Sequence, residues 1–338
     1  MGDTTAGLLL LLVAGVTNAS FTLPMKFTRR WAWENTWLVW TIFALLILPP
    51  LVTFSTVPDV VQAFADVGIG LVLTVASFGA AWGISQVLFG LAVEAIGIAL
   101  AFSIILGISA AVGSMIPLIR LHPEKILTKG GYGVMAGVAL VIIGVAFCAV
   151  AGQRREIALG ESAKGKTSHA RGLLFAICSG LGAAMVNFGL AFGGPLLASA
   201  EHLGADPLWA PNAVWLPLMM AGSIPNLIYC GYLIGKHKTS AQFSEPGTAP
   251  YWLYAFIMAI FWFGSTSLYG ISTVKLGAWG TILGWPLFMS LIVITASILG
   301  ILTGEWKGAG KQPLRIQIGG VAVLILAVFV LSAASRWV

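Results

Sequence analysis

The sequence predicts an all-α membrane protein with ten transmembrane helices, arranged as two inverted five-helix repeats. Three observations lead to this prediction: the composition, a series of ten apolar segments, and a similarity between residues 82–97 and 262–277. Of the 338 residues, 58% are hydrophobic and only 9% are charged, and the mean hydropathy is +0.95. A soluble domain averages about 25% charged residues. We therefore expect a lipid bilayer to surround most of the chain.

Ten apolar segments of about 20 residues are each long enough to cross a bilayer as a helix. In order along the chain, these segments are 6–24, 37–56, 69–91, 96–119, 131–151, 171–192, 212–235, 251–273, 279–303 and 315–335. The longest polar connection follows the fifth segment. It predicts a first repeat at 1–151, a cytoplasmic linker at 152–170 and a second repeat at 171–338.

The distribution of Lys and Arg predicts the orientation, because cytoplasmic loops carry an excess of these residues. The ten segments place thirteen of them on one side: Lys26, Arg29, Arg30, Arg154, Arg155, Lys164, Lys166, Arg171, Lys236, Lys238, Lys307, Lys311 and Arg315. They place five on the other: Arg120, Lys125, Lys129, Lys275 and Arg336. We expect a multi-pass protein of the inner (cytoplasmic) membrane with both termini outward.

The two halves share a short stretch of sequence at an offset of 180 residues. Within 82–97 and 262–277, the identical pairs are Trp82/Trp262, Ser85/Ser265, Leu88/Leu268, Gly90/Gly270 and Gly97/Gly277. Both stretches cover the end of the third segment of their half and the start of the fourth. Five segments are an odd number, so the halves must cross the membrane in opposite senses. This is the inverted repeat of secondary transporters, whose substrate site lies near the midplane between the halves.

No pattern in the sequence favours an enzyme. The four histidines fall in or near predicted loops and lack metal-ligand spacing, and neither a Walker loop nor a Ser, His and Asp set stands out. No basic run is long enough for a nucleic-acid arm. We expect no metal, no cofactor and no nucleic-acid partner.

Ionisable residues inside a membrane are candidates for function. All twelve acids lie in predicted loops or near segment ends, and Glu94, in the turn between the third and fourth segments, is the candidate for proton linkage. The alternative is a solvated charge in a turn. The sequence has no obvious buried carboxylate, which weakens a proton-coupled mechanism.

Neutral polar and aromatic residues within the segments form a second group of candidates. The hydrogen-bonding candidates are Asn18, Gln86, Asn187 and Ser265, and the stacking candidates are Trp82, Trp262 and Tyr269. Amides offer both donors and acceptors, as paired sugar hydroxyls require. We therefore expect a neutral polyol to bind between them. Bonds between helices and packing against lipid are the alternatives.

Three stretches resemble the L-rhamnose–proton symporters of the drug/metabolite transporter superfamily. They are "FTLPMKFTRRWAWENTW" at 21–37, "WGISQVLFGLAVEAIGIALAFSIILGISAAVGSMIPL" at 82–118 and "GEWKGAGKQP" at 304–313. The resemblance covers the whole chain in length, segment number and motif order. It implies ten helices in two inverted repeats and uptake of L-rhamnose or a related deoxy sugar with protons.

Three functional hypotheses follow from these observations. The first is a secondary active transporter that imports a neutral monosaccharide, with L-rhamnose as the expected substrate, by proton symport with alternating access. The second is an uncoupled facilitator or exporter of small metabolites from the same superfamily. The third is a non-transporting membrane partner or receptor, which the inverted repeat argues against. The sequence leaves the oligomeric state open.

Overall fold

The computed structural model describes residues 2–160 and 169–336, and these residues form helices with short connections and no β-strand. The α-helices are α1 (Gly2–Ser20), α2 (Trp33–Thr41), α3 (Leu48–Thr56), α4 (Val60–Val67), α5 (Ile69–Ile96), α6 (Ile98–Leu121), α7 (Lys129–Ala158), α8 (His169–Ala183), α9 (Met185–Phe192), α10 (Gly194–His202), α11 (Asn212–His237), α12 (Ala249–Leu276), α13 (Gly280–Leu302) and α14 (Lys311–Ala334). The predicted all-α class is confirmed.

Within the described residues, nine helical stretches are long and apolar enough to cross a membrane. The eighth, Ala249–Leu302, has 54 residues and would be about 80 Å long as one straight helix, more than twice the hydrocarbon thickness. It contains α12 and α13, which a 3-10 turn at Gly277–Trp279 separates. The backbone of Gly277 has a φ of 59°, which favours glycine and ends α12.

Two helical stretches are interrupted. The α8–α10 stretch breaks at Ala184 and again at Gly193, which leaves α9 as a short helix. Between α2 and α3 the chain forms a π-helix at Ile42–Ile47. Pro49 and Pro50 follow after Leu48, and neither can donate a backbone hydrogen bond, so the α-helical pattern is disturbed at this point.

Helix α5 lies unusually close to α11. A Cβ atom added to Gly79 would lie 1.9 Å from the carbonyl oxygen of Leu218, and one added to Gly83 would lie 2.3 Å from that of Gly222. Small residues permit this approach, as in other membrane helix pairs. The contact places Trp82, which lies between the two glycines, directly against Gly222.

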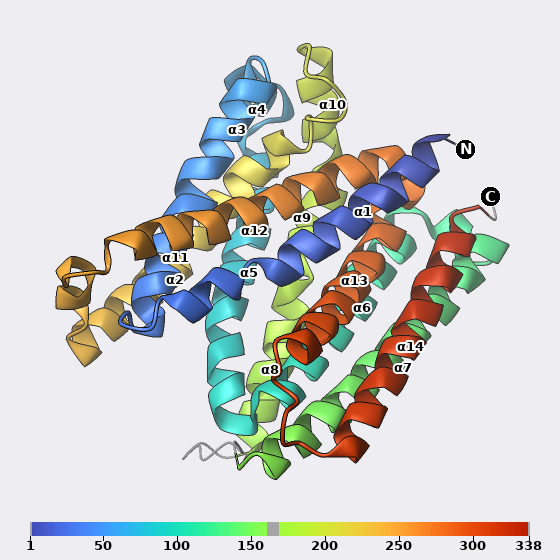
Figure 1. Cartoon of the computed structure of the whole chain (residues 1–338). Helices are drawn as coiled ribbons and strands as arrows, with labels where there is room; N and C mark the ends of the chain where they lie inside the picture. The colour runs from blue at the N-terminus through green and yellow to red at the C-terminus, as the bar shows by residue number, and fades with distance from the viewer. Residues whose placement is uncertain (1, 161–168, 337–338) are drawn as a thin grey trace.

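In Figure 1, α1 runs alongside α12, and α7 runs alongside α14, and both pairs are in contact. The two ends of the chain lie toward the same end of the molecule. Helix α7 continues to Ala158, seven residues beyond the expected end of the fifth segment, and α8 begins at His169. Residues 161–168, including Lys164 and Lys166 of the predicted cytoplasmic set, lie outside the described residues.

Candidate functional site

The structure brings Asn18 and Ser265 together from opposite halves of the chain. The side-chain amide of Asn18 on α1 donates a hydrogen bond of 2.8 Å to the hydroxyl of Ser265 on α12. Ser265 is buried, and its hydroxyl donates to the carbonyl oxygen of Trp262 at 2.6 Å. Asn18 is only half-buried. The bond thus joins α1 of the first half to α12 of the second half, at a position where Asn18 keeps some exposure.

Trp82 and Trp262 form the aromatic centre of the candidate site. Their rings stack with centroids 5.3 Å apart and an interplanar angle of 23°. Trp40 of α2 contacts Trp262 edge-on, with centroids 5.3 Å apart. The rings fill the space between α5 and α12. In this conformation each indole thus has one face covered by the other ring.

Asn187 and Tyr269 are also in contact, but both side chains are buried and the amide of Asn187 already has hydrogen-bond partners. The amide nitrogen of Asn187 donates to the carbonyl oxygens of Gly113 and Thr281, at 2.8 and 2.9 Å. Its amide oxygen accepts a hydrogen bond from the Tyr269 hydroxyl. Both side chains are buried. In this conformation the pair connects α6, α9, α12 and α13 and presents no free polar atom of Asn187.

Gln86 and Glu94 lie further along α5 and differ in exposure. Gln86 is half-buried, one helical turn beyond Trp82, and no hydrogen bond to its amide is formed within the described residues. Glu94 is exposed in the last turn of α5. Its carboxylate has no ion-pair partner among residues 2–160 and 169–336. The structure thus places Glu94 apart from the tryptophans.

Trp40 is a neighbour of the site that sequence reasoning missed. It is buried, and its indole N–H has no partner within the described part of the chain. Trp37 contacts Trp40 with ring centroids 4.5 Å apart and donates to the amide oxygen of Asn226 at 3.2 Å. The spacing of Trp33, Trp37 and Trp40 is a helical one, and it could have indicated a shared face.

Two carboxylates are buried, which corrects the expectation that the chain has none. Glu34 is 5% exposed and Glu156 is 7% exposed. Both lie near helix ends, where the sequence pattern resembles a solvated loop. Tertiary packing covers them.

Glu34 is held by the second half of the chain. Its carboxylate lies 2.8 Å from Nδ1 of His237 at the end of α11 and accepts from the Thr239 hydroxyl at 3.3 Å. The adjoining Asn35 donates to the Thr239 carbonyl oxygen at 3.0 Å. These contacts join the start of α2 to the connection between α11 and α12.

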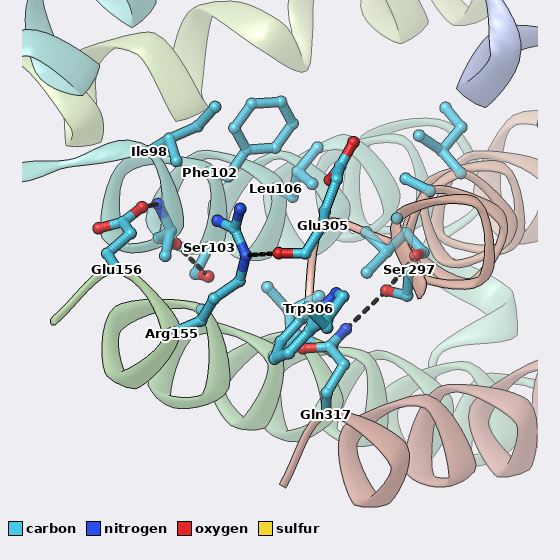
Figure 2. A pocket seen from close by; sticks show the side chains of 18 residues that line it. Ile98, Phe102, Ser103, Leu106, Arg155, Glu156, Ser297, Glu305, Trp306 and Gln317 are labelled. Carbon is cyan, nitrogen blue, oxygen red and sulfur yellow. Dashed lines mark hydrogen bonds between the residues drawn. The ribbon is translucent and has the colours of Figure 1, made fainter. Parts of the chain in front are cut away.

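Glu156 lines a cavity of about 220 Å³ between α6, α7, α13 and α14 (Figure 2). Its carboxylate accepts a hydrogen bond of 3.0 Å from the backbone N–H of Ala99 at the start of α6. Across the cavity, Arg155 Nε donates to the carbonyl oxygen of Glu305 at 2.6 Å, and Gln317 donates to Ser297 at 2.7 Å. Polar groups from four helices and one connection thus meet around this cavity.

Comparison with known proteins identifies the family. The family model described as "L-rhamnose-proton symport protein (RhaT)" matches residues 2–335. The chain belongs to the L-rhamnose–proton symport protein family. An L-rhamnose-proton symporter of Salmonella typhi is 29% identical over 330 residues, covering 96% of each chain. L-rhamnose-proton symporters of Yersinia pestis (strain Pestoides F) and Yersinia pseudotuberculosis serotype O:1b (strain IP 31758) are each 30% identical over 328 residues, covering 95% of each chain.

Membership of the L-rhamnose–proton symport protein family confirms the resemblance seen in the sequence. It identifies a multi-pass membrane transporter rather than an enzyme, in agreement with the nine apolar helical stretches of the described residues. The family name refers to a proton as well as a sugar. This makes the two buried carboxylates, Glu34 and Glu156, the residues of greatest interest outside the aromatic site.

Proposed function

We propose that this protein imports L-rhamnose together with protons, by alternating access between two halves of the chain. The observation that carries the proposal is the family match over residues 2–335, with relatives of that name aligned over nearly their whole length. The match spans both halves of the candidate site. Substrate and coupling ion are therefore inferred from proteins that share the complete architecture rather than a fragment of it.

The same proposal includes ten membrane crossings in two inverted repeats. Counting α12 and α13 as separate crossings converts the nine apolar stretches into ten. Each half makes the same contacts with the other. Helix α5, the third crossing of the first half, packs against α8 and α11 in the first two crossings of the second half. Helix α12, the third crossing of the second half, packs against α1 and α2 in the first two crossings of the first half. The repeats would occupy 1–151 and 171–338, with 152–170 as the linker.

The stacking of Trp82 on Trp262 supports the inverted repeat independently. The two residues are equivalent at the offset of 180, and equivalent residues of two repeats touch only near the axis that relates them. In inverted-repeat transporters the substrate site lies at the repeat interface near the midplane. Both observations favour a substrate site at these rings.

We assign the sugar contacts to the residues around this axis. Asn18, Gln86 and Ser265 supply hydrogen bonds, and Trp82 and Trp262 supply the apolar faces that a pyranose ring stacks on. Asn187 and Tyr269 contribute only if a conformational change releases the bonds of Asn187 to Gly113 and Thr281. Glu94 remains a candidate for proton linkage because it lies on α5, the helix that carries Trp82.

The orientation is proposed from the charge distribution. Thirteen Lys and Arg on one side against five on the other favour a cytoplasmic linker and outward termini in the bacterial inner membrane. Reaction of single cysteines placed near residues 4 and 335 with an impermeant thiol reagent tests this, in a variant without the three native cysteines. Labelling of intact cells at both positions is expected, and protection of either in intact cells contradicts the orientation.

The alternative is an uncoupled facilitator or exporter of the same superfamily. One observation favours it: within residues 2–160 and 169–336, no acidic side chain contacts Trp82 or Trp262. Uptake of labelled L-rhamnose into cells that lack their own carrier, with and without a protonophore, separates the two. Uptake that collapses with the protonophore supports symport. Uptake that persists supports a facilitator, and absence of uptake in cells with confirmed expression contradicts L-rhamnose as substrate.

A further inference from the structure

We propose that Glu156 binds the co-transported proton in the step before its release on the side of the membrane where α6 begins. This inference rests on the proposed function of sugar–proton symport. It concerns a residue far along the chain from Glu94 and outside the aromatic site.

Among the described residues, the two buried carboxylates differ in their partners. Glu34 faces the imidazole of His237 at 2.8 Å and accepts from the Thr239 hydroxyl at 3.3 Å, so a proton that moves onto Glu34 disturbs both contacts. Glu156 forms no ion pair with any described Lys, Arg or His. Its polar contact is the backbone N–H of Ala99 at 3.0 Å. Glu156 can therefore gain or lose a proton without the loss of a salt bridge.

The cavity gives Glu156 access to water. A volume of about 220 Å³ holds several water molecules, and hydrogen-bonding side chains line part of its wall. The other ionisable groups that line it are Arg155 and Cys148 on α7 and Glu305 in the connection between α13 and α14 (Figure 2). Glu305 is already paired with Lys26 at 2.9 Å. The lining residues of α6, α13 and α14 do not ionise.

The position of Glu156 links its charge to a helix end. A negative charge at the N-terminus of a helix is stabilising, because the first backbone N–H groups lack partners within the helix. Glu156 satisfies one of them in the first turn of α6. Gly97, with a φ of 84°, joins α6 to α5, and α5 carries Trp82 and Gln86. The charge on Glu156 therefore stabilises the turn that joins α6 to the substrate-site helix.

The proposed step is a simple proton transfer. The neutral carboxyl group of Glu156 gives its proton to a water molecule in the cavity, and its O–H bond breaks as a new O–H bond forms on that water. The carboxylate that remains stabilises the start of α6, and the protonated water passes the proton to bulk solution. No electrons are transferred. When Glu156 is neutral, the start of α6 loses this stabilisation, and α5 and α6 can move together.

The experiment compares the purified wild-type protein with Glu156→Gln in liposomes. Gln keeps an oxygen that can accept from Ala99 but cannot exchange a proton. Two rates are measured: counterflow of labelled L-rhamnose without a gradient, and accumulation driven by an inward proton gradient over a range of pH. We expect Glu156→Gln to retain counterflow and to lose accumulation and its pH dependence. Glu94→Gln tests the competing candidate for the proton site. Glu201→Gln, which alters an exposed carboxylate near the end of α10, is the control and should retain both activities.

The outcomes separate this inference from the proposed function. Wild-type protein that shows no L-rhamnose counterflow contradicts the proposed function, and the role of Glu156 with it. Wild-type protein that shows both activities, together with a Glu156→Gln variant that still accumulates sugar, overturns the role of Glu156 alone. Loss of accumulation in Glu94→Gln with Glu156→Gln unaffected assigns the proton to Glu94 instead.

A measurement on the unmodified protein covers the case in which Glu156→Gln does not fold. A hydrophobic carbodiimide reacts with protonated carboxyl groups in apolar surroundings, and peptide mapping identifies the residue modified. We expect modification of Glu156, reduced at high pH, in parallel with the loss of gradient-driven accumulation. Loss of accumulation with Glu156 unmodified would overturn the proposal.

Discussion

Trp82 and Trp262 stack on each other across the two halves of the chain, at positions separated by the repeat offset of 180 residues. Their contact closes the space in which the sugar is proposed to bind. If the sugar binds there as proposed, the rings must separate for binding and meet again afterwards, which would give them two roles, as a binding surface and as a barrier. The first prediction tests this double role.

Trp262→Ala should abolish L-rhamnose uptake, because it removes both the stacking surface and the closure. Trp262→Phe should retain part of the uptake with a raised KM, because an aromatic face remains. Trp262→Ala also removes packed ring area at a cost of up to about 3–5 kcal/mol, so the folded yield of both variants is measured alongside uptake. Uptake kinetics normalised to membrane expression provide the measurement. Wild-type uptake by Trp262→Ala would exclude the ring from the site.

Asn18→Leu should abolish transport without lowering the folded yield. Its bond to Ser265 is a single hydrogen bond between membrane helices, worth roughly 0.5–2 kcal/mol. Thr74→Val is the control, because the exposed Thr74 hydroxyl bonds only to Gly70 of its own helix. Fluorescence-detected gel filtration measures the yield, and uptake measures the activity. Unchanged uptake in Asn18→Leu would remove Asn18 from the site.

Asn187→Leu should instead lower stability. The substitution leaves the carbonyl oxygens of Gly113 and Thr281 and the hydroxyl of Tyr269 without their partner. Each buried group left unsatisfied costs about 1–3 kcal/mol. The midpoint of thermal unfolding in detergent should fall well below that of Asn18→Leu. If the two midpoints coincide, the structural role of Asn187 is contradicted.

Glu34→Gln and His237→Ala should each lower the free energy of unfolding. The double variant should lose less stability than the two single losses added together. The carboxylate is buried, and removal of its partner leaves a charge without compensation. The His237 imidazole is half-exposed, so solvent screening limits the contribution of this contact to about 1 kcal/mol or less. A double-mutant cycle from unfolding midpoints measures the coupling. Strict additivity would mean that the contact contributes nothing to stability.

Gly79→Ala should disrupt the contact between α5 and α11, since the new Cβ would lie 1.9 Å from the Leu218 carbonyl oxygen. Gly90→Ala is a control on the same helix, because no heavy atom lies within 4 Å of its added Cβ. We expect Gly90→Ala to be neutral or stabilising by about 0.5–1 kcal/mol. Gly79→Ala should lower both the unfolding midpoint and uptake. Equal behaviour of the two variants would contradict the close approach.

Hydropathy was sufficient to locate the apolar segments and the helical class, because the bilayer imposes a long apolar run on each crossing. It placed helix ends poorly. Helix α7 has 30 residues and continues through the polar "GQRREIA" that resembled a linker, so the burial of Glu156 was not foreseen. Helix formation at that position depends on backbone hydrogen bonds and packing rather than on hydropathy.

The direction of a polar side chain was also beyond the sequence. Asn18 and Asn187 are both asparagines within apolar segments, but their surroundings differ. Asn18 is half-buried and bonds to one side chain, whereas Asn187 is buried and bonds to three partners. The position of an asparagine along its helix does not show whether its side chain faces a cavity or bonds to a carbonyl group of a neighbouring helix. Only the packed arrangement of four helices does so.

The π-helical stretch at Ile42–Ile47 has a consequence for comparisons within the family. Such a stretch accommodates one residue more than an α-helix of the same length, and a single inserted residue rotates all later side chains by about 100°. Trp40 precedes the stretch and faces Trp262, whereas Thr53 follows it and donates to the Asn212 carbonyl oxygen at 2.9 Å. Members that differ by one residue here should therefore preserve one of these two contacts and lose the other.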